Sequence, residues 1–218
     1  MIVAQAVAAQ TAAVPVAWLV ARAAGLVTLA LLTCSVTLGL ALSTRVLGNR
    51  RGKMLIGWHQ TLTWTALAML GLHMGALVLD PTIHFGLVGV LVPGAAPWRP
   101  VPVAAGILTG WVMLALAVSF HVRRRIGQRR WRVLHYASFG AFTIGVYHAL
   151  NVGTDFTGTR GLILAGIVMA PVMWLTFARI LIPRPQARPS PTPRITAPPA
   201  ALAIVKPPPE KRRVAVRT

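Results

Sequence analysis

The stretch WRVLHYASFGAFTIGVYHALNVGTD, residues 131–155, places His135 and His148 in an otherwise apolar run. A second stretch, WHQTLTWTALAMLGLHMGALVLD at residues 58–80, repeats the arrangement with His59 and His73. Histidine is costly to bury unless its ring nitrogens find partners, and ionisable residues inside membrane segments usually have a function. The surroundings of these four histidines therefore decide both the fold class and the candidate site.

Five apolar segments are long enough to cross the hydrocarbon core of a bilayer, which takes about 20 helical residues. They cover residues 17–43, 55–79, 102–121, 133–152 and 161–182. Because backbone polar groups cannot stay unpaired in lipid, these segments are expected to be helices. The sequence therefore predicts an all-α fold, an integral membrane helical bundle with about five transmembrane helices.

The composition fits a membrane protein better than a nucleic-acid binder. Of the 218 residues, 56% are hydrophobic and 11% are charged, whereas a soluble domain carries about a quarter charged residues. The net charge is +19, and the basic residues form short clusters between apolar segments instead of covering a polar surface. We therefore expect a lipid bilayer as partner, no nucleic acid, and a multi-pass location in the cell membrane, the inner or cytoplasmic membrane of a bacterium.

The basic residues also predict the orientation and the division of the chain. Nineteen of the 22 lysines and arginines fall in the first and third connections and at the C-terminal end, which leaves Arg22, Arg99 and Arg160 for the other side. The positive-inside rule then places the N-terminus outside and the C-terminus inside. We expect a short lead at residues 1–14, a membrane domain at 15–182, and a Pro/Arg-rich, disordered cytoplasmic tail at 183–218.

The four histidines are expected at two depths of the membrane. The second and fourth segments run in the same direction, so His59 and His135 lie near the cytoplasmic side, and His73 and His148 lie near the outer side. At a rise of 1.5 Å per residue the two levels are about 20 Å apart. Each level therefore holds one histidine from each of two helices.

One angular difficulty accompanies this arrangement. Fourteen residues of ideal helix return to within about 40° of the same face, whereas thirteen residues end about 140° away. His135 and His148 are thirteen residues apart, so a straight helix would not point both at one partner helix. Gly140 and Gly145 lie between them, and we expect the helix to bend there.

Two histidines at each level suit an iron that is already held by a porphyrin, because neutral imidazoles occupy its two axial positions. A zinc site would need three or four ligands at one level, and a proton relay usually includes Asp or Glu, which the interiors of these segments lack. For a single histidine, a hydrogen bond to a neighbouring helix is the simpler explanation. His84 and His121 have no partner at their levels, and they are expected to be interfacial or solvated.

These residues resemble the ferric reductase-like transmembrane domain, a family that includes the membrane parts of ferric reductases and NADPH oxidases. It also includes the haem-binding membrane subunit of the bacterial periplasmic methionine sulfoxide reductase system. The H-x13-H and H-x12-H pairs carry the resemblance, together with WLVARAAGLVTLALL, APWRP and RRIGQRRWRVLHY, over about residues 15–182. The resemblance implies transmembrane electron transport through two haem b groups, with a single haem as the alternative. The axial iron ligands that it implies are the pairs His59–His135 and His73–His148.

The resemblance also implies partners. The chain contains no G-x-G-x-x-G at a strand–helix junction, so we expect a separate flavoprotein or quinol as electron donor. The expected outer acceptor is ferric ion, oxygen or a reductase protein, and the chain would be the membrane subunit of an oxidoreductase. The alternative is a non-redox membrane protein, a scaffold or a transporter of metal or protons that uses the same histidines.

Basic and aromatic residues near the histidines are expected to contact the haems. A buried propionate needs a cation, and the candidates are Arg22 and Arg99 outside and Lys53 and Arg132 inside. Five aromatic residues are expected to line the porphyrin faces. They are Trp58, Trp64, Phe139, Phe142 and Tyr147.

Overall fold

The computed structural model describes residues 16–44, 52–81 and 84–181. The predicted lead at residues 1–14 and the predicted tail at residues 183–218 lie outside these ranges. So do the basic residues of the first connection other than Lys53. The chain divides into two units, Met1–Pro183 and Arg184–Thr218, and only the first contains described residues.

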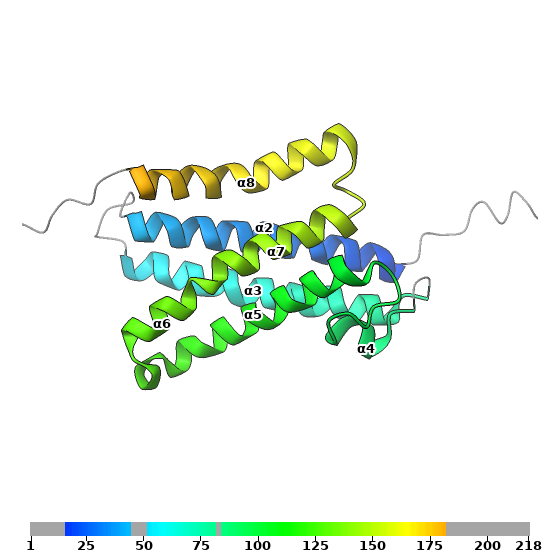
Figure 1. The fold of residues 1–218 in the computed structure, drawn as a ribbon, viewed down its shortest axis with the longest axis horizontal. Coiled ribbons are helices and arrows are strands. Elements are labelled where there is room, and N and C mark those ends of the chain that lie inside the picture. Colours follow the sequence, from blue (N-terminus) through cyan, green and yellow to red (C-terminus); the bar gives the residue numbers. More distant parts are fainter. Residues whose placement is uncertain (1–15, 45–51, 82–83, 182–218) are drawn as a thin grey trace, which may run out of the picture. The chain divides into compact units, whose positions relative to one another are not determined.

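Every regular element in the described ranges is a helix, and four of these helices are long and apolar enough to cross a membrane. They are α2 (Val16–Thr44), α3 (Gly52–Leu79), α5 (Pro100–Ile126) and α8 (Gly158–Leu181). A fifth segment consists of α6 (Gln128–His135) and α7 (Ala137–Val152), and it runs roughly along the same axis as the others (Figure 1). The predicted all-α membrane bundle is therefore confirmed, while its orientation in the membrane stays a prediction.

The fourth predicted segment, residues 133–152, differs from the expectation because it is not one continuous helix. It starts earlier, at Gln128, and breaks at Tyr136. The backbone N–H of Tyr136 donates to the carbonyl of Val133, and that of Phe139 donates to the carbonyl of Tyr136, both at 3.1 Å. These hydrogen bonds span three residues, as in a 3₁₀ turn, which is wound more tightly than an α-helix.

The break also corrects the position of the expected bend, because Tyr136 precedes both Gly140 and Gly145. A 3₁₀ residue advances about 120° around the axis instead of about 100°. The extra rotation lies between His135 and His148 and reduces their angular mismatch. Gly145 serves a different purpose, since a Cβ at this position would lie 3.1 Å from Cγ2 of Thr109 on α5.

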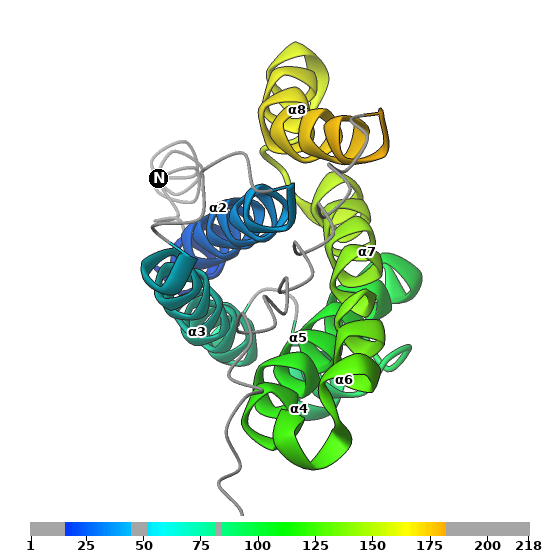
Figure 2. The ribbon, with the colours of Figure 1, turned by 90° about the vertical axis from the view of Figure 1, so that its left-hand side faces the viewer.

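Two helix pairs form the bundle. α2 packs along α3, and α5 packs along α7. In Figure 2 the first pair lies on one side and the second on the other, with α8 against α2. The short α4 (Gly86–Leu91), which was not predicted, lies between α3 and α5 in the chain. The site residues described below come from facing sides of these two pairs.

Apolar packing fixes the pairs, and apolar side chains also cover the outside. One buried cluster joins α2, α7 and α8, and it contains Leu29, Val36, Leu40, Phe142, Val146 and Val172. Outward-facing Leu79, Leu162 and Trp174 are each about three-quarters exposed. Large exposed apolar surfaces are rare on soluble proteins but suit contact with lipid.

Candidate functional site

The structure brings the four histidines together as two pairs that join α3 to the α6–α7 segment. The ring centres of His59 and His135 are 6.2 Å apart, and the ring planes are 77° apart. The ring centres of His73 and His148 are 6.4 Å apart, with an angle of 83°. The partners predicted at each level are therefore neighbours in space.

Three of the four imidazoles are oriented by backbone carbonyls of a neighbouring helix. The hydrogen bonds join His59 Nδ1 to Ser35 O at 2.9 Å, His73 Nδ1 to Ala21 O at 2.7 Å, and His148 Nδ1 to Pro102 O at 2.8 Å. A carbonyl oxygen only accepts, so Nδ1 carries the proton and donates in each of these rings. Their Nε2 atoms keep a free lone pair, which is the form that a metal-ligating histidine takes.

Each of these carbonyls is followed four residues later by a glycine. The pairs are Ala21 with Gly25, Ser35 with Gly39, and Pro102 with Gly106. In a helix the carbonyl of residue i points toward residue i+4, and side chains tilt back toward the N-terminus, so a side chain at i+4 would crowd that carbonyl. We call each combination of carbonyl and glycine a histidine dock.

The glycines of the docks are in contact with the imidazoles. A Cβ on Gly106 would lie 2.6 Å from Nδ1 of His148, and a Cβ on Gly25 would lie 3.0 Å from Nδ1 of His73. A Cβ on Gly39 would lie 3.4 Å from Cε1 of His59, which is ordinary contact. Gly106 therefore has no room for a side chain, and a side chain at Gly25 would require the ring of His73 to move by a few tenths of an ångström.

Sequence reasoning missed these docks, although one signal was present. Gly25 and Gly39 on α2 are fourteen residues apart, the same spacing as His59 and His73 on α3. Two antiparallel helices with matching spacings can repeat one contact at two levels. Gly106 does not belong to a pair of glycines with a matching spacing. Only its packing against His148 reveals its role.

His135 is held differently from the other three histidines. Its Nδ1 is buried and has no hydrogen-bond partner among the described residues. Its ring stacks on that of Trp131, with the ring centres 5.0 Å apart and the planes 22° apart. Trp131 is held in turn by its indole N–H, which donates to Ser119 Oγ at 3.2 Å.

A cavity lies beside each histidine pair. After the predicted orientation, we name the one lined by His73 and His148 the outer cavity, and the one lined by His59 and His135 the inner cavity. Their volumes are about 310 and 280 Å³. The outer cavity lies at the small end of the usual size of ligand sites, about 300–1,000 Å³, and the inner cavity lies just below it.

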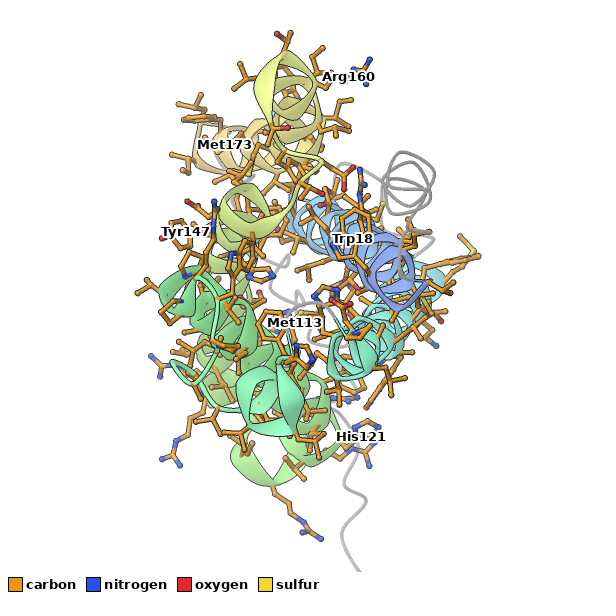
Figure 3. The ribbon with its side chains drawn as sticks, turned by 90° about the vertical axis from the view of Figure 1, so that its right-hand side faces the viewer. Trp18, Met113, His121, Tyr147, Arg160 and Met173 are labelled. Carbon is orange, nitrogen blue, oxygen red and sulfur yellow. The ribbon has the colours of Figure 1, made fainter. Side chains whose placement is uncertain are left out.

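Two apolar residues line both cavities and thus lie between the two levels. They are Leu32 on α2 and Met113 on α5. Figure 3 shows Met113 in the middle of the bundle, while His121 and Tyr147 lie at its edge. Met113 is only 5% exposed, so a buried apolar side chain lies between the two levels.

The two arginines predicted on the outer side differ in position. Arg22 lines the outer cavity, and its Nε donates to Oδ2 of Asp155 at 2.7 Å. A second bond joins Nη2 of Arg22 to Oδ1 of Asp155, and the guanidinium lies 5.1 Å from the ring centre of Trp18. Arg99 does not line the cavity, and its guanidinium donates to the backbone carbonyl of Asn151.

The ion pair changes the acidity of Asp155, which lies in the connection between α7 and α8. The hydrogen bond from Arg22 holds the pKa of this carboxyl below its ordinary value of 3.8. The carboxylate is therefore ionised at neutral pH, and it neutralises Arg22. Of the four basic residues considered as partners of a propionate, Arg22 thus already forms an ion pair with an acidic residue of this chain.

On the inner side, Arg132 lines the inner cavity, but Lys53 does not. The structure adds Arg179 from α8, which sequence reasoning did not single out. Arg179 donates to Ser43 Oγ at 2.7 Å and to the Tyr136 hydroxyl at 3.3 Å. No acidic side chain lines this cavity in the part of the chain that is described, so its charge is positive.

Of the five aromatic residues expected around the haems, two line a cavity and three do not. Trp64 and Phe139 line the inner cavity. Phe142 is buried in the apolar cluster instead, and Trp58 and Tyr147 are exposed on the outside at 58% and 44%. The last three therefore line neither cavity.

The remaining two histidines lie away from the pairs. His84 is exposed between α3 and α4 with φ of 56°. His121 is exposed near the end of α5, with its ring centre 6.0 Å from that of Trp64. Neither histidine lines a cavity beside the pairs.

Over residues 16–44, 52–81 and 84–181, no group of three or more His, Cys, Asp or Glu side chains is placed to hold a metal ion. Each pair offers two nitrogen ligands, fewer than a bare zinc ion takes from a protein. A metal at these pairs would need further ligands from a cofactor. No protein-family model, no curated protein and no solved structure matches the chain.

Proposed function

We propose that this protein carries electrons across a membrane through two b-type haems, one at each histidine pair. The proposal makes it the membrane subunit of an oxidoreductase system of the ferric reductase-like kind. The observation that carries it is the geometry of the pairs, which present two imidazoles each beside a cavity.

The spacing of the rings supports a single metal between the members of each pair. A metal–imidazole bond of about 2 Å on each side, plus about 1.1 Å from nitrogen to ring centre, separates two coaxial rings by about 6.2 Å. The observed separations are 6.2 and 6.4 Å. Two directly hydrogen-bonded imidazoles are an alternative, but at the outer pair both His73 and His148 donate their Nδ1 proton to a carbonyl, so neither Nε2 carries a proton to share.

A bound haem b would supply one-electron redox chemistry. The residues of the chain perform three tasks around it. The histidines hold it, and the docks fix their tautomers and orientations. Leu32 and Met113 keep the interval between the levels apolar.

The charged residues would bind the acidic edge of the cofactor. Arg132 and Arg179 on the inner side have no acid beside them in the described part of the cavity, and they suit carboxylates. On the outer side Arg22 would have to share its charge between Asp155 and the cofactor. We therefore assign the propionate role to Arg132 and Arg179 inside and to Arg22 outside, and not to Arg99.

The donor and the acceptor would be separate molecules. A flavoprotein or quinol would supply electrons at the inner side, and ferric ion, oxygen or a reductase protein would take them at the outer side. The basic last turn of α5, with Arg123, Arg124 and Arg125, suits an acidic partner protein.

Electron transfer across liposome membranes tests the proposal. The full chain, loaded with haem, is placed in vesicles that contain ferricyanide, and dithionite is added outside. Each ferricyanide that is reduced to ferrocyanide takes one electron from dithionite. We expect rapid reduction with the wild-type protein and only leakage with His73→Leu/His148→Leu. Equal rates would contradict the proposal. A haem-free protein that instead moves metal ions or protons would establish the transporter alternative.

A further inference from the structure

We infer that His135 is an exchangeable ligand, so that the inner site can take up a small neutral π-acceptor molecule while the outer site cannot. The inference rests on the proposed function, because it requires an iron at the inner pair. It goes beyond electron transfer, since it gives one of the two sites a ligand-binding activity.

The two sites differ in how their imidazoles are held. Both imidazoles of the outer pair occupy docks, at 2.7 Å for His73 and 2.8 Å for His148. At the inner pair only His59 occupies one. The Nδ1 of His135 is buried without a hydrogen-bond partner in the described part of the chain, and this ring is held by stacking on Trp131.

The missing hydrogen bond affects the strength of the ligand. A carbonyl that accepts from the second ring nitrogen makes the ligating nitrogen more basic and fixes the ring, and loss of such a partner typically costs 10–100-fold in metal affinity or activity. His135 should therefore leave its metal more readily than the other three histidines do. A stacking contact allows the imidazole ring to slide and tilt, whereas a hydrogen bond fixes the direction in which the ring points.

The position of His135 in the chain permits such a movement. His135 is the last residue of α6, directly before the break at Tyr136. Its ring lines the inner cavity, the space in which the proposed haem would lie. The opposite ligand stays in place, because Nδ1 of His59 lies 2.9 Å from the carbonyl and 3.1 Å from the hydroxyl of Ser35.

The exchange replaces one bond to the iron by another. With a haem bound, His135 would release the reduced iron from its Nε2, and the carbon of carbon monoxide would take that place. No electron or proton is transferred in this step. Carbon monoxide is the probe because it binds reduced haem iron only where an axial position becomes free.

Two double variants separate the sites. His73→Leu/His148→Leu removes both outer ligands and keeps the inner pair, and His59→Leu/His135→Leu does the reverse. Each full-length protein is purified with its haem, its haem content is measured, and the dithionite-reduced form is titrated with carbon monoxide. We expect a carbon monoxide difference spectrum from the inner-only protein, with an affinity at least about 10-fold higher than that of the outer-only protein.

Wild-type protein provides the measurement that does not depend on the variants folding. We expect carbon monoxide to shift the Soret absorbance of half of its haem. A shift of none or of all of the haem would overturn the inference while leaving the proposed function intact. Absence of haem would overturn the proposed function itself.

A gain of binding gives a further check. Gly106→Ala forces His148 away from the Pro102 carbonyl, since the new Cβ would lie 2.6 Å from its Nδ1. In protein that retains both haems, the fraction that binds carbon monoxide should rise from half toward all. An unchanged half would show that the docks do not control the exchange.

Discussion

At the level of single residues, the tautomer of an imidazole decides what it can bind. His59, His73 and His148 each give their Nδ1 proton to a carbonyl, so each presents Nε2 to its partner ring. The spacing of the histidines predicted which rings would meet. It could not predict the docks, because a backbone carbonyl exists at every position and only the fold shows which one is reached.

The first prediction concerns the dock glycines. Gly106→Ala should lower the haem content of the protein by up to one haem per chain, because overpacking of this kind costs about 1–3 kcal/mol. Gly39→Ala is the matched control, since its Cβ would lie 3.4 Å from the nearest imidazole atom. The pyridine haemochrome assay on purified protein measures both. Equal haem content in the two variants, together with equal carbon monoxide binding, would show that the glycines do not hold the rings.

The second prediction concerns the Arg22–Asp155 ion pair. Because Arg22 lowers the pKa of Asp155, the pair stabilises the folded protein above the ordinary carboxyl value of 3.8, and this stability is lost as the pH falls below that value. Asp155→Asn should therefore lower the Tm slightly at pH 5–7. The effect is small because the side chains are 39% and 18% exposed.

Thermal unfolding in detergent, followed by circular dichroism, checks this pH dependence. The Tm difference between wild type and Asp155→Asn should shrink as the pH is lowered below 3.8. A difference that stays constant down to pH 3 would mean that the asparagine disturbs packing and that the charge is not responsible.

At the level of helices, the break at Tyr136 is the feature that the sequence did not locate. The 13-residue spacing of His135 and His148 showed that an ideal helix would misdirect one ring. It did not show where the helix changes, because the glycines were the obvious sites and the break occurs at a tyrosine instead. The hydrophobic segments themselves were predicted to within a few residues, since their length is set by the bilayer.

The third prediction tests this break. One alanine inserted between Tyr136 and Ala137 turns His135 by about 100° relative to α7. The inner haem should then be lost while the outer haem is retained, which halves the haem content. One alanine inserted after Gly94, in the exposed connection between α4 and α5, is the control and should leave the haem content unchanged. Loss of the outer haem in the first variant would contradict the assignment of the levels.

At the level of the whole molecule, an electron path needs a direction across the membrane. The positive-inside rule supplies it, with the turn between α5 and α6 on the cytoplasmic side. The length and mean hydropathy of the four longest helices are compatible with either orientation, because each can cross a membrane in both directions.

The fourth prediction concerns this orientation. Cys34 is the only cysteine, so Cys34→Ala provides a background for single cysteines. A membrane-impermeant maleimide should label Ala95→Cys in intact cells, and it should label Arg125→Cys only after the membrane is permeabilised. Both positions are exposed. The reverse pattern would place the inner cavity on the outside.

The central claim is that two imidazoles bind one iron at each level, and the spectrum of the purified full-length protein tests it most directly. Protein expressed with ample haem should carry two b-type haems per chain, with low-spin six-coordinate spectra in the oxidised form. Leucine at any one of the four histidines should remove the haem of its own level only. Protein that is folded but free of haem, or that keeps both haems after these replacements, would contradict the account.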